Sequence, residues 1–182
     1  MAPSLNKLVE EIEAQRRAAL QAFASVNDDQ FNQSPGQGKW SAAEVFSHII
    51  TAERMSVTYL QKKMLGIEQA ARSGMWEEVK IAALILTQRM PGLKFKAPQR
   101  VVDSTVSLKS RKEIESSWDQ VRTDLRKLLE QIPDQYVDRM IYRHVVAGYL
   151  NVRHALIFFR EHLHHHTPQL NRLQQQLKPQ TS

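Results

Sequence analysis

The sequence predicts an all-α protein: a four-helix bundle with a long mid-chain loop and a short extra helix. Apolar residues recur every three or four positions along four long stretches of the 182-residue chain, as in helices that bury one face. Breaker-rich segments separate the stretches, for example Ser-Pro-Gly-Gln-Gly at residues 34–38. Helices joined in this way favour a bundle. We expect one domain over residues 1–182, with its core at about residues 5–175.

The first two helices follow from apolar spacing and from one capping signal. A first helix is expected from about Ser4 to Val26, because its apolar residues share one face. The second is expected from Ser41 to about Leu65. Ser41 and Glu44 match a capping box, in which the hydroxyl accepts a backbone N–H one turn in and the carboxylate bonds back to the cap.

The middle of the chain alternates connections and helices. Residues 66–74 are expected to be a connector, and residues 76–89 a shorter helix. Residues 90–110 show no helical period, so we expect a long loop, which in a small domain is often functional. A further long helix is expected from Ser110 until Pro133 stops it. Its apolar positions step by four and three, as in a bundle: Ile114, Trp118, Val121, Leu125, Leu128 and Ile132.

The last helix is expected from near Tyr149 to as far as Leu177, and it carries most of the histidines. Four of the chain's seven histidines lie between positions 162 and 166. Steps of four and three again define a stripe that is apolar except at His166: Val152, Leu156, Phe159, Leu163, His166, Leu170, Leu173 and Leu177. His166 is therefore expected on the core side of this helix.

His162 and His166 can reach one common atom. They stand four residues apart, about 40° apart around a helix, and histidine is the commonest metal ligand. A buried imidazole without a partner costs roughly 1–3 kcal/mol, so we expect each to have one. The spacing leaves two interpretations open, hydrogen-bonded core histidines or metal ligands. His164 is expected to be solvated on the opposite face, and His165 to be a spectator.

A metal in a bundle needs ligands from more than one helix. His48, the only histidine in the first half of the chain, is expected on the rim of the second helix's apolar face. His144 and His154 are the other candidates, although His154 is about 80° round from His162 and is not expected to share its metal. Glu44 could add a fourth ligand, but capping already explains it. Glu53 is expected to face away from His48. Glu161 is expected to face largely outward, in a solvated or salt-bridged role rather than as a metal ligand.

Composition excludes several kinds of site. The absence of cysteine excludes disulfides, thiolate metal ligands and a cysteine nucleophile. No apolar run approaches the roughly 18–20 residues that span a bilayer, and we expect a cytoplasmic protein. The formal charge is +6, but basic and acidic residues are mixed, so a solvated surface is favoured over a nucleic-acid footprint.

Two motifs resemble a known family. The segment Lys-Trp-Ser-Ala-Ala-Glu-Val-Phe-Ser-His at residues 39–48 resembles the Trp-Ser-x-x-Glu-x-x-x-His signature of DinB-like proteins. Residues 158–170 resemble their closing motif, in which Gln and an aliphatic residue follow a pair of histidines. The resemblance implies an up-down-down-up bundle, often homodimeric. It also implies a divalent metal ion, such as zinc, nickel or iron, held by His48, His162 and His166.

The sequence departs from the family pattern at Pro168. Proline inside the last helix removes the hydrogen bond to the His164 carbonyl and is expected to kink the chain. The kink could tilt His166 or end the helix early. The run of three histidines also leaves open a register in which His165 replaces His166 as the ligand.

Three functions are expected in decreasing order. The first is a metal-dependent enzyme on a small molecule, because three imidazoles leave a coordination position open. The resemblance implies that it is either an S-transferase using a low-molecular-weight thiol or a hydrolase. Glu44 is a weak candidate for its general base, and the loop at residues 94–96 could line its pocket. The second is a non-enzymatic metal-binding or stress-response module. The third, nucleic-acid binding by the basic span 89–112, is disfavoured because that span holds one aromatic residue.

Overall fold

The computed structural model describes residues 1–90 and 99–177, and these residues are mostly helical. A two-stranded antiparallel sheet and two short 3-10 turns, at Ile67–Gln69 and Asp134–Tyr136, complete them. The elements are α1 (Pro3–Gln21), α2 (Asp28–Asn32), α3 (Ala42–Met64), α4 (Met75–Arg89), α5 (Gln99–Ser104), α6 (Arg111–Glu130), β1 (Tyr142–His144), β2 (Gly148–Leu150) and α7 (Val152–Leu177).

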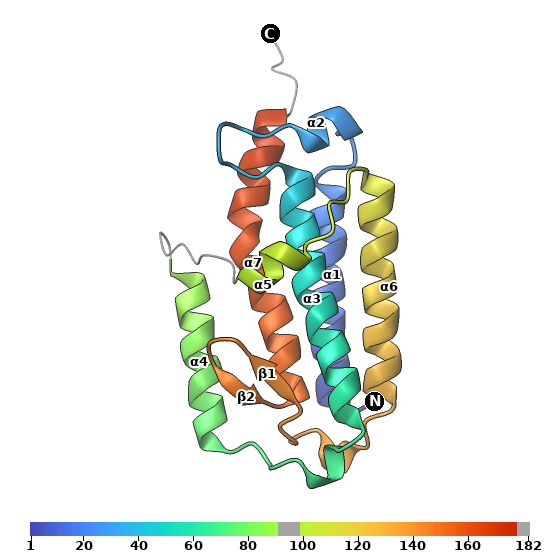
Figure 1. The fold of residues 1–182 in the computed structure, drawn as a ribbon, viewed down its shortest axis with the longest axis vertical. Coiled ribbons are helices and arrows are strands. Elements are labelled where there is room, and N and C mark those ends of the chain that lie inside the picture. Colours follow the sequence, from blue (N-terminus) through green and yellow to red (C-terminus); the bar gives the residue numbers. More distant parts are fainter. Residues whose placement is uncertain (91–98, 178–182) are drawn as a thin grey trace.

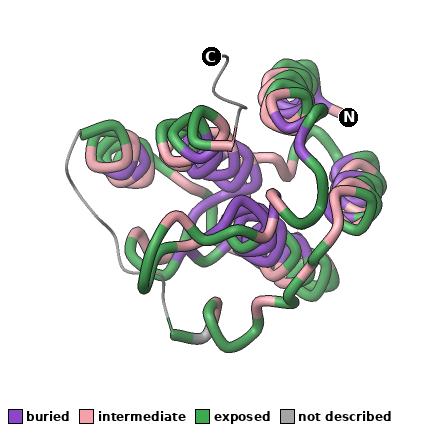
Figure 2. Tube along the Cα trace, turned by 90° about the horizontal axis from the view of Figure 1, so that it is seen from above, coloured by how far each residue is buried: buried purple, intermediate pink, exposed green. Residues whose placement is uncertain are grey.

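Four long helices, α1, α3, α6 and α7, run along the long axis of the molecule (Figure 1). Helices α1 and α7 run in one direction, and α3 and α6 in the other. Helix α3 packs against both α6 and α7, α1 packs against α7, and α4 covers the outer side of α7. Viewed from above, the helices turn their buried residues inward (Figure 2). None of the described helices is long and apolar enough to cross a membrane.

An aromatic cluster fills the core where the upper ends of α1, α2, α3 and α6 meet. Phe23 lies edge-on to Phe31 and Phe46, at centroid distances of 5.7 and 5.5 Å. Phe46 lies 6.0 Å from Trp118 of α6. All four rings are almost fully buried. Because a buried aromatic side chain stabilises the fold by roughly 1.5–3 kcal/mol, this cluster holds α2 and the start of α3 in place.

Capping boxes start two of the long helices. The predicted box of α3 is confirmed: Ser41 Oγ accepts the Glu44 N–H at 3.2 Å, and the Ser41 N–H donates to the Glu44 carboxylate at 2.8 Å. Helix α6 begins in the same way, with Ser110 as cap and Glu113 as its partner. Such caps satisfy backbone groups that a helix end leaves unpaired, so α3 and α6 begin where the sequence indicated.

The first predicted helix is too long. Helix α1 ends at Gln21, and residues 22–25 form turns. Asn27 then starts α2, because its side chain accepts the Gln30 N–H at 2.9 Å. The apolar residues that follow α1, Phe23 among them, are still buried in the core. Their spacing therefore continued the apolar pattern of α1, and the predicted helix came out too long.

Two segments contain elements that the sequence did not indicate. The expected loop includes the short helix α5, and the segment before α7 forms the hairpin of β1 and β2, so α7 starts at Val152 rather than near Tyr149. Tyr142 pairs with Leu150 and His144 with Gly148. Gly148 adopts φ +72°, a conformation that favours glycine. Strands of three residues are too short to show a recognisable alternation.

Pro168 does not end the last helix early, which was one of the two effects that the sequence left open. Helix α7 continues through it to Leu177. Thr167 Oγ1 donates to the Leu163 carbonyl at 2.9 Å. Beyond the proline, Leu170 and Leu173 are buried in the core, and this packing stabilises the helix against the loss of one backbone hydrogen bond.

A buried group of charges links α1, α3 and α6. Glu53, fully buried, accepts from Trp118 Nε1 at 2.8 Å and from Arg122 at 2.9 Å. Arg122 also lies 3.1 Å from Glu13. We call Glu13, Glu53, Trp118 and Arg122 the charged cluster. Burial raises the pKa of the Glu53 carboxyl, and Arg122 and the Trp118 hydrogen bond oppose that rise. Glu53 thus points to α6 rather than to His48.

Candidate metal centre

Three histidines from two helices meet between α3 and α7. His48 lies in the second turn of α3, and His162 and His166 lie one turn apart on α7. Their ring centroids are 5.2 Å apart for His48 with either partner and 4.9 Å for the α7 pair. Each offers one ring nitrogen, and the three nitrogens lie within 4.8 Å of one another. We call these three residues the histidine cluster.

The spacing of the histidine cluster is compatible with a metal ion. Zinc binds imidazole nitrogen at about 2.0–2.1 Å, so nitrogens on one tetrahedral ion lie about 3.4 Å apart. The present nitrogens, within 4.8 Å of one another, need to approach by at most about 1.4 Å.

Burial keeps the three imidazoles neutral. His48 and His162 are buried and His166 is partly buried. Burial lowers the pKa of His48 to about 4, helped by His165, and lowers that of His166 to about 4, helped by His48. Burial and then the neighbouring His166 lower the pKa of His162 well below its usual value. Because a metal binds the unprotonated imidazole, no proton competes for these nitrogens at neutral pH.

Two buried nitrogens of the cluster have no hydrogen-bond partner among the described residues. These are Nδ1 of His48 and Nδ1 of His162. An unpaired buried polar atom costs roughly 1–3 kcal/mol, so a ligand at this position would relieve that cost. His166 differs, because its Nδ1–H donates to Gln169 Oε1 at 3.2 Å. That bond leaves Nε2 of His166 unprotonated and available to a metal.

Aromatic rings enclose the cluster. The Trp40 ring lies 5.1 Å from that of His48. Phe158, one turn before His162, stacks on it at 5.2 Å and 19° between planes. His144 of β1 in turn contacts Phe158 at 4.6 Å. These rings limit the orientations open to His48 and His162 and reduce the water around them.

The other two histidines of the α7 run do not belong to the histidine cluster, although the His165 ring lies 5.3 Å from that of His166. His164 is exposed, as expected. His165 Nδ1 donates to the Gln88 carbonyl of α4 at 3.0 Å, so the structure brings His166 rather than His165 to His48. The position of His166 on the apolar stripe, flanked by Leu163 and Leu170, is the sequence signal that distinguishes it.

Glu161 does not face outward as the sequence indicated. Its side chain is 1% exposed and forms two hydrogen bonds with Arg89 of α4, at 2.6 and 2.8 Å, and one with Arg160 at 2.9 Å. Burial raises the pKa of its carboxyl, but the two guanidiniums outweigh that effect and hold the pKa below its usual value. Glu161 is therefore an ion-paired anchor between α4 and α7 and is not a ligand.

The remaining candidates lie outside the cluster. Glu44 caps α3. His154 is fully buried and donates to Glu78 at 3.0 Å, as expected for a residue on another face of α7. His144 Nδ1 accepts the N–H groups of Val146 and Ala147. The loop at residues 94–96 lies outside the described residues.

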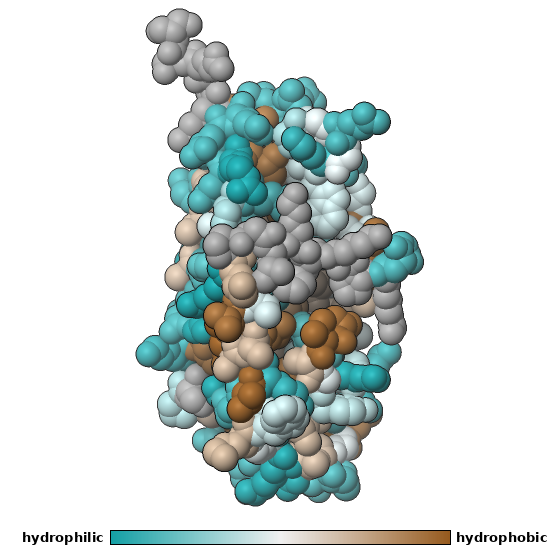
Figure 3. All heavy atoms as spheres, turned by 90° about the vertical axis from the view of Figure 1, so that its left-hand side faces the viewer, coloured by the Kyte–Doolittle hydropathy of each residue, from teal (hydrophilic) through white to brown (hydrophobic). Residues whose placement is uncertain are grey.

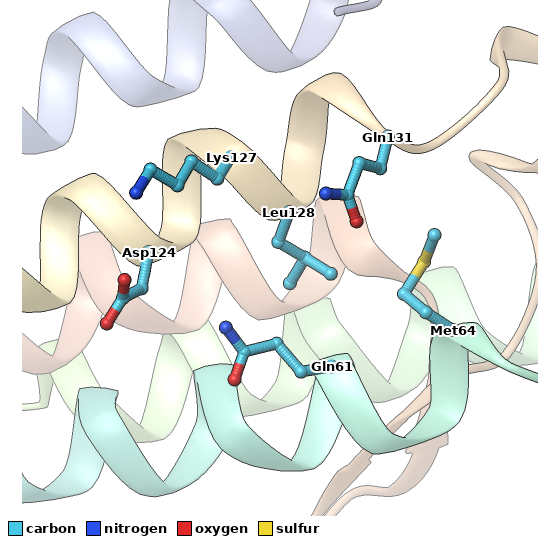
Figure 4. A pocket seen from close by; sticks show the side chains of 6 residues that line it. All are labelled: Gln61, Met64, Asp124, Lys127, Leu128 and Gln131. Atoms are coloured by element: carbon cyan, nitrogen blue, oxygen red, sulfur yellow. The ribbon is translucent and has the colours of Figure 1, made fainter.

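Two hollows lie away from the histidines. One, of about 200 Å³, lies between the C-terminal halves of α3 and α6 (Figure 4) and is lined by Gln61, Met64, Asp124, Lys127, Leu128 and Gln131. The other, of about 540 Å³, adjoins the start of α4 and includes Glu78 and Arg153. Neither contains a described histidine, so neither offers a comparable donor set.

Comparison with known protein families identifies the chain. The family model of the DinB superfamily matches residues 11–170. The chain belongs to the DinB superfamily. The match covers α3, α7 as far as residue 170, and all three residues of the histidine cluster. Searches of curated proteins and of solved structures gave no match. The DinB assignment therefore rests on the family model, and it agrees with the resemblance of residues 39–48 and 158–170.

Proposed function

We propose that this DinB protein is a metal-dependent enzyme that holds one divalent ion through His48, His162 and His166. The observation that carries the proposal is the convergence of three neutral imidazoles, two of which have a buried nitrogen without a partner. All-imidazole donors suit zinc, nickel or iron. We also propose that the four long helices form the up-down-down-up bundle, in a single cytoplasmic domain.

Three protein ligands leave at least one coordination position open, the pattern of catalytic rather than structural sites. A bound ion would lower the pKa of a coordinated thiol or water. This supports an S-transferase using a low-molecular-weight thiol, or a hydrolase, on a small molecule. The protein's own part is to orient His166 through Gln169 and to exclude water with Trp40 and Phe158.

A second candidate is a metal-binding module without catalysis. This candidate is favoured because Glu44 and Glu161, two acidic residues close in sequence to the histidine cluster, are both engaged in other interactions. The Glu44 carboxylate caps α3, and Glu161 is ion-paired to two arginines. Neither is free to act as general base, so a hydrolase of this design would need its base from the substrate or from another part of the chain.

The first experiment measures metal content. Untagged protein produced with zinc, nickel or iron supplements is expected to carry about one ion per chain, and His48→Ala and His166→Ala are expected to lose it. His164→Ala is the matched control, because His164 is exposed on the same helix. Wild-type protein without stoichiometric metal under every supplement would overturn the proposal.

The second experiment separates the two candidates. Metal-loaded protein is tested against electrophiles with low-molecular-weight thiols, and against esters and amides. Turnover that disappears in His48→Ala and persists in His164→Ala supports the enzyme. Bound metal without turnover in any arm favours the binding module.

A further inference from the structure

Helix α4 runs beside the lower half of α7 in the same direction (Figure 1) and packs against it. Ile81 and Leu84 on its inner side are buried in the core. Its outer side exposes apolar residues such as Trp76 and Leu86, and Figure 3 shows brown and tan side chains on the lower half of this face. Besides its apolar contacts, α4 holds α7 through polar contacts near both of its ends.

The last turn of α4 holds two residues of α7 that neighbour the predicted metal ligands. Arg89 donates two hydrogen bonds to Glu161, at 2.6 and 2.8 Å. One residue earlier, the Gln88 carbonyl accepts a hydrogen bond from His165 Nδ1 at 3.0 Å. We call Glu161 and His165 the held pair. Each of them directly precedes a residue of the histidine cluster.

The held pair and the two ligands of α7 have the same spacing. Glu161 and His165 are four residues apart. The ligands are also four apart, each one position after a held residue, which is a rotation of about 100° around the helix. The two pairs therefore lie on adjacent sides of the same turns of α7, one toward α4 and the other toward α3. Any rotation of α7 that the contacts with α4 permit is transmitted to both ligands at once.

A small rotation of α7 is enough to spoil a metal site. Side-chain atoms lie roughly 5–6 Å from a helix axis, so a rotation of about 10° displaces them by about 1 Å. A metal site tolerates deviations of about 0.2 Å in its ligand distances. A guanidinium that donates two hydrogen bonds to one carboxylate is held in a defined orientation. The contact between Arg89 and Glu161 is therefore suited to fix the rotation of α7 where it presents its ligands.

Burial makes this contact costly to break. The Glu161 side chain is 1% exposed, and that of Arg89 is 52% exposed. A buried carboxylate that loses its cationic partner is strongly unfavourable, so α7 is held where Glu161 meets Arg89. Arg160 also donates to Glu161, at 2.9 Å. A variant of Arg89 thus leaves the carboxylate one cationic partner and is expected to fold.

We propose that Arg89 is a positioning residue of the metal centre, because its contact with Glu161 fixes the rotation of α7 that turns two histidines toward His48. This inference rests on the proposed function, since it requires a metal ion at the histidine cluster. It gives α4 a part in the metal centre although α4 supplies no ligand.

Affinity for cobalt(II), measured by competition with a chromophoric chelator, tests the proposal. Arg89→Met is expected to weaken the affinity about 10-fold and to change the visible absorption of the bound cobalt, which reports its coordination geometry. Arg89→Lys keeps the charge but not the two parallel hydrogen bonds, so its affinity is expected to lie between those of Arg89→Met and the wild type. If Arg89 acts through Glu161, adding Arg89→Met to Glu161→Gln should weaken the affinity no further.

The matched control loosens the other end of α4. Glu78, near the start of α4, pairs with Arg153 and His154 of α7, and His154 lies eight residues before His162. Glu78→Ala removes these contacts. Urea denaturation is expected to show lower stability for Glu78→Ala as well as for Arg89→Met. Only Arg89→Met is expected to change the affinity for cobalt and its absorption.

Two results would overturn the proposal alone. One is an unchanged cobalt affinity in Arg89→Met. The other is an equal loss of affinity in Arg89→Met and Glu78→Ala, which would mean that stability, and not the orientation of α7, controls metal binding. A wild-type protein that binds no cobalt would instead overturn the metal site, and this inference with it. Circular dichroism verifies that each variant is folded.

Discussion

Helix α3 borders two buried polar groups of opposite character. Through Glu53 it joins the charged cluster with α1 and α6, and through His48 it joins the histidine cluster with α7. In the charged cluster, each carboxylate faces a guanidinium and the Trp118 N–H has an acceptor. In the histidine cluster the groups are neutral, of one kind, and two nitrogens have no partner.

The difference teaches how to separate structural from functional polar groups in one core. In the charged cluster, Arg122 Nε and Glu13 Oε1 form no hydrogen bond, but they face each other as opposite charges 3.1 Å apart. Adding a ligand there would disrupt these ion pairs. The imidazoles of the histidine cluster carry no opposite charges that could pair, and Nδ1 of His48 and Nδ1 of His162 have no hydrogen-bond partner among the described residues. The first arrangement holds helices together, and the second is suited to bind something further.

The largest expected effect is in the charged cluster. Glu53→Ala leaves Arg122 and the Trp118 N–H without their buried partner, so we expect a loss of about 3–5 kcal/mol in the free energy of unfolding. Glu10→Ala removes an exposed partner of Arg126 at 3.6 Å and should cost less than about 1 kcal/mol. Urea denaturation measures both. Equal losses would mean that the cluster is no more structural than a surface pair.

The second prediction concerns pH and the metal-free protein. Burial lowers the pKa of His144 to about 4, while an unfolded imidazole titrates near 6.5. Between these values the unfolded chain binds the proton and the folded chain does not, so stability falls as the pH drops from about 6.5 to 4. This residue accounts for about 3 kcal/mol over that window.

The control for that prediction is His144→Asn, which keeps a side-chain acceptor but does not titrate. Thermal unfolding of both proteins across the pH window is expected to show a shallower dependence for the variant. Identical pH profiles would place the acid sensitivity elsewhere, and the remaining slope measures the contribution of the other histidines.

The smallest effect is expected at Gln169. Gln169→Leu removes the acceptor that orients His166, and losses of this kind typically weaken metal affinity about 10- to 100-fold. Gln169→Glu keeps an acceptor and should retain affinity. Competition with a chromophoric chelator measures the affinities, and Gln175→Leu, exposed further along α7, controls for the loss of an amide. Unchanged affinity in Gln169→Leu would show that the packing of α7 alone orients His166.

Local signals in the sequence predicted much of the helical framework and the residues of the histidine cluster. Ser41 with Glu44 marked the start of α3, and the stripe of α7 placed His166 on the core side. The capping pair and the apolar stripe each belong to a single helix, so each can be recognised from a few turns of sequence. His48 came from the resemblance together with its place on the rim of α3, and the structure brings it to the pair on α7.

Long-range pairing explains what could not be predicted. Glu53 and Glu161 can be buried because each pairs with an arginine. Those arginines lie 69 and 72 residues away in the sequence. No local period reports such a partner, and a charged residue on a helix is normally exposed. The hairpin was missed for a similar reason, since Tyr142 and Leu150 are recognisable as a pair only once the strands are aligned.

The distribution of tryptophan gives each region its own optical probe. The chain has three tryptophans: Trp40 beside His48, Trp76 exposed on α4, and Trp118 in the charged cluster. In single-tryptophan variants, quenching of Trp40 by a paramagnetic ion would follow metal loading. A blue shift of Trp76 emission would report burial of the outer face of α4, and Trp118 emission would report loosening of the core. One fluorescence instrument could thus follow three separate equilibria in the same molecule.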